Sequence, residues 1–209
     1  MNWRKALPVL LNRNILILGG ASFLSFACQY SFYTYLALFL TKELNRTVVQ
    51  AGLFFALAFF VGGAGRVLWS MMSDYLLGGR RKGILILITW VQLFSLFTLS
   101  LTSFFPTLSR FLLIPVLTFG ISAIGNSALF LTILAEATRE ESAGVATSVG
   151  FFFGYMGSFL CTPLFGHIVD RAGFYGYGWL FLTICTGLTI LFLSYFREKN
   201  GTGSEFRNQ

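Results

Sequence analysis

The sequence has 209 residues, of which 56% are hydrophobic and only 11% are charged, and its formal net charge is +7 at pH 7. Soluble domains carry about 25% charged residues, so the composition excludes an ordinary soluble domain and indicates a chain that lies in lipid. The basic residues separate apolar runs instead of clustering on a water-exposed fold, so we expect the lipid bilayer as a partner and no nucleic acid. The three cysteines lie inside apolar runs without metal-ligand spacing, so no metal, cofactor or disulfide is predicted.

Six apolar runs are long enough to cross a membrane, because a hydrocarbon core about 30 Å thick takes about 20 helical residues. In chain order they cover residues 14–40, 48–73, 83–105, 111–134, 143–169 and 174–196. The connections between them are short and polar and leave no room for a soluble domain. The predicted fold class is therefore an all-α polytopic membrane protein with six transmembrane helices.

The Lys and Arg residues of the connections predict the orientation of the chain, because short cytoplasmic loops carry an excess of positive charge. With an even number of spans both termini share one side. Ten basic residues fall on that side: Arg4, Lys5, Arg13, Arg80, Arg81, Lys82, Arg139, Arg197, Lys199 and Arg207. Four fall on the other: Lys42, Arg46, Arg110 and Arg171. We therefore expect the terminal segments, 1–13 and 197–209, in the cytoplasm and the chain in the cytoplasmic membrane.

The two halves of the sequence show similar features at a constant separation. Asp74 and Asp170 follow the second and fifth spans, and Gln29 and Asn126 lie near the middle of the first and fourth. An odd number of spans in each unit makes the second unit enter the membrane from the opposite side. This pattern predicts an inverted repeat, a construction common in secondary transporters. The predicted units are residues 14–105 and 106–196.

Polar side chains recur on one face of the first span and on the fourth span. An amide or hydroxyl exposed to lipid is unfavourable, so these side chains are expected to face protein or a water-filled cavity. Hydrogen bonding between helices and contact with a solute both fit this pattern, and both remain open. The residues are Ser22, Ser25, Gln29 and Tyr33 on the first span, and Ser122 and Asn126 on the fourth, where Thr118 precedes them.

The connection after the second span concentrates charge. Asp74 lies at the C-terminal end of that span, and Arg80 and Arg81 lie at the N-terminal start of the next. Each placement opposes the dipole of its own helix, at about 0.3–1 kcal/mol where exposed, so another interaction must favour it. An acid ahead of a basic cluster, with two glycines between them, indicates an ionic latch. Glu136 closes the fourth span at the same level.

This connection resembles a known motif. The stretch "GRVLWSMMSDYLLGGRRKG" is similar to the signature loop of the major facilitator superfamily, Gly-x-x-x-Asp-Arg-x-Gly-Arg-Arg. Ser70 stands in place of its first glycine and Tyr75 in place of the basic residue after the acid. The stretch "AGVATSVGFFFGYMGSFLCTPLFGHIVDRAG" resembles the eleventh helix of the same family. The resemblance covers residues 3 to 198 and fits the C-terminal six of the family's twelve helices.

The resemblance implies transport of a small solute by alternating access. It implies that the first and fourth spans line the solute cavity, which makes their polar residues candidates for substrate binding. It also implies an inner gate that is formed by Asp74, Arg80, Arg81 and Glu136. No acid–base constellation or nucleotide-binding loop is found, so no enzymatic activity is predicted.

Arg66 is the one charged residue clearly within a predicted span. It can pair with Asp74 two turns later, extend toward the interface, or face an anionic substrate. We favour the pair with Asp74 and keep Arg66 among the substrate-binding candidates. With Arg66 as the only buried charge, a small organic anion is the expected substrate. The spans lack Asp and Glu at mid-membrane, so no proton carrier is predicted.

Two hypotheses remain for a chain that resembles half of the twelve-helix fold. In the first, it is one half of a transporter, and a second six-helix half comes from another chain or a second copy. In the second, it is a non-transporting membrane scaffold or a truncated remnant. An intramembrane serine protease does not fit, because His167 closes the fifth span at the outer surface whereas Ser122 lies near mid-membrane.

Overall fold

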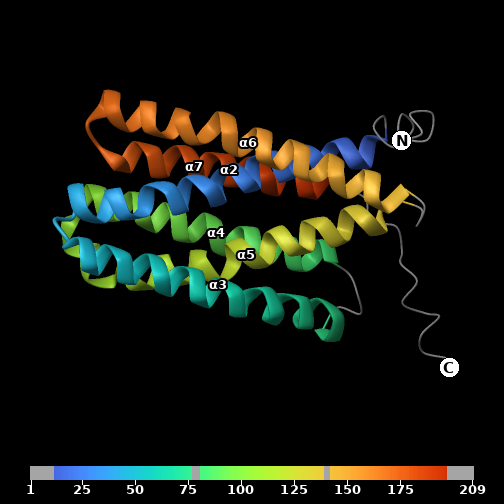
Figure 1. Ribbon diagram of the computed structural model, residues 1–209, viewed down its shortest axis with the longest axis horizontal. Coiled ribbons are helices and arrows are strands. Elements are labelled where there is room, and N and C mark those ends of the chain that lie inside the picture. The colour runs from blue at the N-terminus through green and yellow to red at the C-terminus, as the bar shows by residue number, and fades with distance from the viewer. Residues whose placement is uncertain (1–11, 77–80, 139–141, 197–209) are drawn as a thin grey trace.

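The computed structural model describes residues 12–76, 81–138 and 142–196, and it forms a bundle of long helices that run along one common axis (Figure 1). The helices are α2 (Arg13–Lys42), α3 (Val48–Leu76), α4 (Arg81–Phe104), α5 (Leu113–Glu136), α6 (Ala143–Ala172) and α7 (Tyr175–Tyr195). A short 3-10 helix, η1 (Pro106–Phe111), leads into α5. The six long helices are each apolar and long enough to cross a membrane, and no strand occurs among the described residues. The predicted fold class is confirmed.

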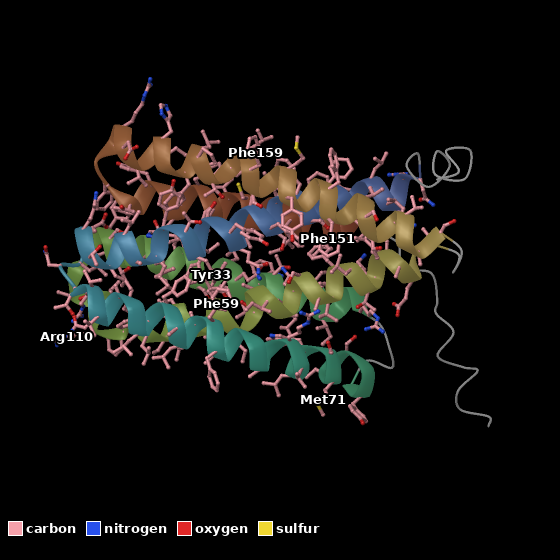
Figure 2. The ribbon with its side chains drawn as sticks, in the orientation of Figure 1. Tyr33, Phe59, Met71, Arg110, Phe151 and Phe159 are labelled. Carbon is pink, nitrogen blue, oxygen red and sulfur yellow. The ribbon has the colours of Figure 1, made fainter. Side chains whose placement is uncertain are left out.

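Successive helices run in opposite directions, so each end of the bundle collects alternate helix termini. The start of α2, the end of α3, the start of α4 and the end of α7 lie together at the right of Figure 1. We refer to this end as the Arg81 end and to the opposite one as the Arg110 end. Arg110 itself marks the latter at the left of Figure 2.

The helices pack mainly as three pairs, α2 with α6, α3 with α5, and α4 with α7. Helices α3 and α6 lie at opposite edges of the bundle and do not touch each other within the described residues (Figure 1). In lipid, helix association depends on close packing, which favours small residues at the contacts. The α3–α5 and α2–α6 pairs both meet this requirement with glycine.

Glycines bring the backbones of the paired helices into direct contact. A Cβ atom on Gly65 of α3 would overlap the carbonyl oxygen of Ile121 of α5, and one on Gly157 of α6 would overlap that of Phe23 of α2. Trp69 strengthens the α3–α5 pair, since its indole N–H donates to the Ile121 carbonyl at 3.0 Å. These helices therefore approach as closely as they do because glycine leaves the space for a backbone carbonyl.

Side chains from other helices close both ends of α7. At its N-terminus no capping side chain precedes the helix, and the Glu43 carboxylate accepts a hydrogen bond from the Tyr175 N–H at 2.7 Å. At its C-terminus the Lys82 ammonium group donates to the carbonyls of Ser194 at 3.0 Å and Phe196 at 2.6 Å. An acid at the N-terminus and a cation at the C-terminus both complement the helix dipole and satisfy terminal backbone groups.

Lys82 explains part of the unusual charge placement in the sequence. It stands at the start of α4, where a cation is unfavourable for its own helix, but its ammonium group serves the C-terminus of α7. The sequence separation of more than 100 residues hides this partner from sequence analysis.

Burial differs strongly between the helices. In an 18-residue apolar segment of each helix, 61% of the segment is buried in α2, compared with 22% in α3 and 39% in α6. Along α3 the outward face carries large apolar side chains, including Leu53, Phe60 and Val67. Figure 2 shows the same for α6, where Phe159 extends from the outer edge. These faces are suited to lipid or to a further apolar protein surface.

We expect Gly65→Ala to destabilise the bundle by about 1–3 kcal/mol, because the added methyl group must push α5 away from α3. Gly63→Ala is the matched control on the same helix, since no atom lies within 4 Å of a Cβ atom at that position. Unfolding of the purified protein in detergent, followed by circular dichroism, measures both variants. Equal stability of the two variants would contradict the close α3–α5 contact.

Candidate functional site

A hydrogen-bonded network of polar side chains crosses the middle of the bundle. The Asn126 amide group of α5 donates to the Ser25 hydroxyl of α2 at 2.9 Å and to the Gln92 side-chain carbonyl of α4 at 3.1 Å. All three residues are buried. The network joins three helices, and it brings together two predicted site residues, Ser25 and Asn126. Gln92 was not among the predicted residues, although Thr89 and Ser95, three residues to either side of it, form a buried polar stripe with it on α4.

The two other predicted serines are also buried. The Ser122 hydroxyl donates to carbonyls of its own helix, those of Thr118 at 2.8 Å and Phe119 at 2.9 Å. Among the described residues, the Ser22 hydroxyl has no hydrogen-bond partner, and neither has the side-chain oxygen of Asn126. Buried polar atoms are normally paired, so these two atoms have unused hydrogen-bonding capacity in this conformation.

Tyr33 and Gln29 lie nearer the surface of α2, and both are partly buried. The Tyr33 ring packs against Phe59 and Phe55 of α3, with ring centroids 4.6 Å and 5.9 Å apart. Figure 2 shows Tyr33 and Phe59 next to each other near the middle of the bundle. The Tyr33 hydroxyl has no partner within the described structure. Sequence analysis identified Tyr33 but neither of the two phenylalanines, since α3 is apolar on nearly every side.

A second aromatic cluster lies where α2 meets α6. Tyr30 of α2 packs against Tyr155 of α6, with centroids 5.9 Å apart, and Phe26 and Phe151 complete the cluster. Tyr30 and Tyr155 are exposed. The two aromatic clusters therefore lie on either side of α2, one against α3 and the other against α6. Apart from a high aromatic content, no sequence pattern predicts this second cluster.

Arg66 is exposed on α3. It follows Phe55 by 11 residues and Phe59 by seven, so the three share one face of the helix, the face that contacts Tyr33. No acidic side chain among the described residues pairs with it. The expected partner, Asp74, has a side chain outside the described part of the structure. Arg66 thus supplies a positive charge on the α3 face that contacts Tyr33, about two turns from Phe59. We refer to Tyr33, Phe55 and Phe59 as the Tyr33 cluster.

The Arg81 end contains one of the predicted gate contacts. The Arg81 guanidinium Nε donates to both Glu136 carboxylate oxygens, at 2.8 Å and 2.9 Å. This pair joins the start of α4 to the end of α5, where each charge opposes its own helix dipole and compensates the other. Arg81 is largely buried and Glu136 is half exposed. Arg80 lies outside the described residues, as does the side chain of Asp74.

Comparison with known protein families identifies the family to which this helical bundle belongs. The sequence model of the Major Facilitator Superfamily matches residues 4–209, nearly the whole chain. The chain belongs to the Major Facilitator Superfamily. This assignment agrees with the six apolar helices and identifies the chain as an integral membrane protein of a transporter family. The Major Facilitator Superfamily is a family of transporters and not of enzymes.

One curated relative within this superfamily is a probable galactarate/D-glucarate transporter of Bacillus subtilis (strain 168). It is 23% identical over 171 residues, which are 82% of the present chain and 38% of the relative. The chain therefore spans well under half the length of this relative.

We expect Asn126→Ala to lower the free energy of unfolding by about 1–2 kcal/mol, because it removes both hydrogen bonds that join α5 to α2 and α4. Ser127→Ala is the matched control, since the Ser127 hydroxyl bonds only to the Ile124 carbonyl of its own helix. Unfolding in detergent measures both. Equal losses in the two variants would show that the network does not hold the helices together.

Proposed function

We propose that the chain forms one six-helix half of a secondary transporter that moves a small solute across the membrane by alternating access. The family match over residues 4–209 carries this proposal. The relative's greater length and the exposed apolar faces of α3 and α6 support a second six-helix half, from another chain, a second copy or a longer form of the same polypeptide. The alternative is a membrane scaffold that does not transport.

The internal organisation supports the same mechanism. If residues 14–105 and 106–196 are two copies of one unit, then α2, α3 and α4 correspond to α5, α6 and α7. Contacts between helices should then occur in corresponding pairs. The α2–α6 contact, the most extensive in the bundle, then becomes the α5–α3 contact, the second most extensive, and α4–α7 replaces itself. This correspondence is what two inverted repeats produce. From the excess of Lys and Arg in the sequence connections on the side of the termini, we further propose that both termini lie in the cytoplasm and that the membrane is the plasma membrane.

The solute cavity is proposed to lie against the face formed by the Tyr33 cluster and Arg66. Tyr33 offers an unpaired hydroxyl between aromatic walls, Gln29 lies one turn away, and Arg66 supplies a positive charge. An exposed arginine within a span is a natural partner for an anionic solute. The Bacillus subtilis relative is a probable transporter of galactarate and D-glucarate, which are both dicarboxylates. A small organic anion is therefore the proposed substrate class.

The buried candidates contribute by a different route. Ser25 and Asn126 bond across α2 and α5 in this conformation, while Ser22 and Ser122 face the interior of the bundle. They can meet the solute only when α2 moves away from α5. The Ser22 hydroxyl can then donate a hydrogen bond to a carboxylate of the solute, and the Asn126 side-chain oxygen can accept one from a hydroxyl of the solute.

The inner gate is proposed to comprise Asp74, Arg80, Arg81 and Glu136. The Arg81–Glu136 pair holds the end of α5 against the start of α4. Release of this pair frees the cytoplasmic end of α5, which is the movement that opens an inner gate. Glu136 is half exposed, and ion pairs that remain in contact with solvent contribute about 1 kcal/mol or less, so this pair can break within a transport cycle.

Uptake by proteoliposomes that contain the chain tests the substrate class. We expect uptake of labelled galactarate but not of its neutral alditol, galactitol, because Arg66 attracts a carboxylate. Arg66→Gln should lower galactarate uptake about tenfold, the effect of about 1.4 kcal/mol. Arg171→Gln, which changes an exposed arginine at the end of α6, is the matched control and should retain uptake.

Two results would contradict these proposals separately. Equal uptake of galactarate and galactitol would overturn the anionic substrate class but not transport. A chain that remains a single six-helix monomer by native mass, and takes up neither compound, would favour the scaffold.

Charge reversal tests the gate. Arg81→Glu and Glu136→Arg each place two like charges at the pair, so we expect the ends of α4 and α5 to separate in each single variant. The double variant restores an opposite pair and should recover the closed distance. Spin labels at Gly83 and Ala137 report this distance, and coupling of about 1 kcal/mol corresponds to an about fivefold shift between the two states. A double variant as open as the singles would contradict the gate.

A further inference from the structure

A groove of about 350 Å³ lies between α4 and α5, away from the Tyr33 cluster. Helix α4 contributes Val91, Phe94, Ser95 and Thr98, and the opposite wall is formed by Phe111, Ile114, Pro115 and Thr118. Phe94, Phe111 and Ile114 are exposed, so the groove opens on the outside of the bundle. Its size lies within the range of sites that bind small molecules.

The hydroxyl groups in the groove are already satisfied. Ser95 donates to the Val91 carbonyl at 2.7 Å and is 2.8 Å from the Thr118 hydroxyl, which in turn lies 2.8 Å from the Ile114 carbonyl. The Thr98 hydroxyl donates to the Phe94 carbonyl at 2.7 Å. With their polar atoms paired, these side chains offer mainly methyl and methylene surface. The groove is therefore suited to a hydrocarbon chain and not to a polar solute.

The groove has a direction relative to the bundle axis. The wall opposite α4 extends from Phe111 of η1 to Thr118 of α5, a separation of seven residues or about 10 Å of helical rise. Phe111 belongs to η1 at the Arg110 end, and Thr118 lies deeper in the membrane span. A hydrocarbon chain in the groove thus runs from the membrane interface toward the middle of the bilayer, parallel to the lipid chains around it.

A cation stands at the interfacial end of the groove. Arg110 immediately precedes Phe111 and comes one turn before Ile114, both of which line the groove. Figure 2 shows Arg110 at the end of the bundle. It is exposed, and no acidic side chain among the described residues pairs with it. An arginine at this level can bind a phosphate group with two parallel hydrogen bonds.

We propose that this site binds a membrane phospholipid, with the phosphate on Arg110 and one acyl chain in the groove between α4 and α5. The charge of Arg110 selects a phosphate-bearing lipid, and the apolar walls hold the chain. In a phospholipid the phosphate lies close to the start of each acyl chain. The site has the same arrangement, because the groove begins at the residue next to Arg110. The site is separate from the proposed solute cavity and does not depend on transport.

Lipid binding to the full chain tests the proposal. The purified, delipidated protein in detergent is titrated with dioleoyl phosphatidylglycerol and, separately, with dioleoylglycerol, which has the same chains but no phosphate. Native mass spectrometry measures the bound fraction. We expect phosphatidylglycerol to bind about fivefold more tightly, the effect of one basic residue near a lipid phosphate.

Three variants locate the site. Arg110→Gln should abolish the preference for phosphatidylglycerol, while Arg171→Gln, at the same end of the bundle, should retain it. Val91→Phe fills the groove and should weaken the binding of both lipids. Circular dichroism and gel filtration confirm that each variant is folded. Retention of the preference in Arg110→Gln, or its equal loss in Arg171→Gln, would overturn the proposal and indicate a general lipid shell around the protein.

Discussion

The two adjacent cations at the start of α4 tie the Arg81 end of the bundle together. Arg81 binds the Glu136 carboxylate at the end of α5, and Lys82 binds the last carbonyls of α7. Charge that is unfavourable for α4 alone thus stabilises the ends of two other helices. At the opposite end, the Glu43 carboxylate accepts a hydrogen bond from the first N–H group of α7. Helix α7 is therefore fixed at both termini by side chains from the first half of the chain.

Between these ends, the packing divides the bundle into closely joined and loosely covered parts. Glycines join α3 to α5 and α2 to α6 through direct backbone contact. Beyond its stripe of contact with α5, α3 exposes large apolar side chains. Van der Waals packing drives helix association in lipid, so an apolar face is satisfied there by lipid or by another helix. The structure thus combines rigid helix pairs with outer faces that can accept further partners.

Most of the fold could be predicted from the sequence, because long apolar runs have few alternatives in a bilayer. The predicted spans differ from the helices by only a few residues at their ends. The contacts within the site were harder to predict. A helix that is apolar on nearly every side gives no signal of which face meets which neighbour, so Phe55, Phe59 and the partner role of Gln92 were missed. The partners of Lys82 lie too far away in sequence for any local pattern to reveal them.

Helix α2 connects the interior of the bundle to its exposed face. Ser25 bonds to Asn126 inside, whereas Tyr30 and Tyr33, one to two turns later, join the aromatic clusters outside. Any movement of α2 away from α5 must break the Ser25–Asn126 bond, and interhelical bonds in membranes contribute about 0.6 kcal/mol on average. The Arg81–Glu136 pair adds about 1 kcal/mol or less. The glycine contacts, in contrast, belong to the extensive packing of α3 on α5 and of α2 on α6. The polar contacts are therefore the ones that can open and close at low cost, while the glycine contacts keep each helix pair intact.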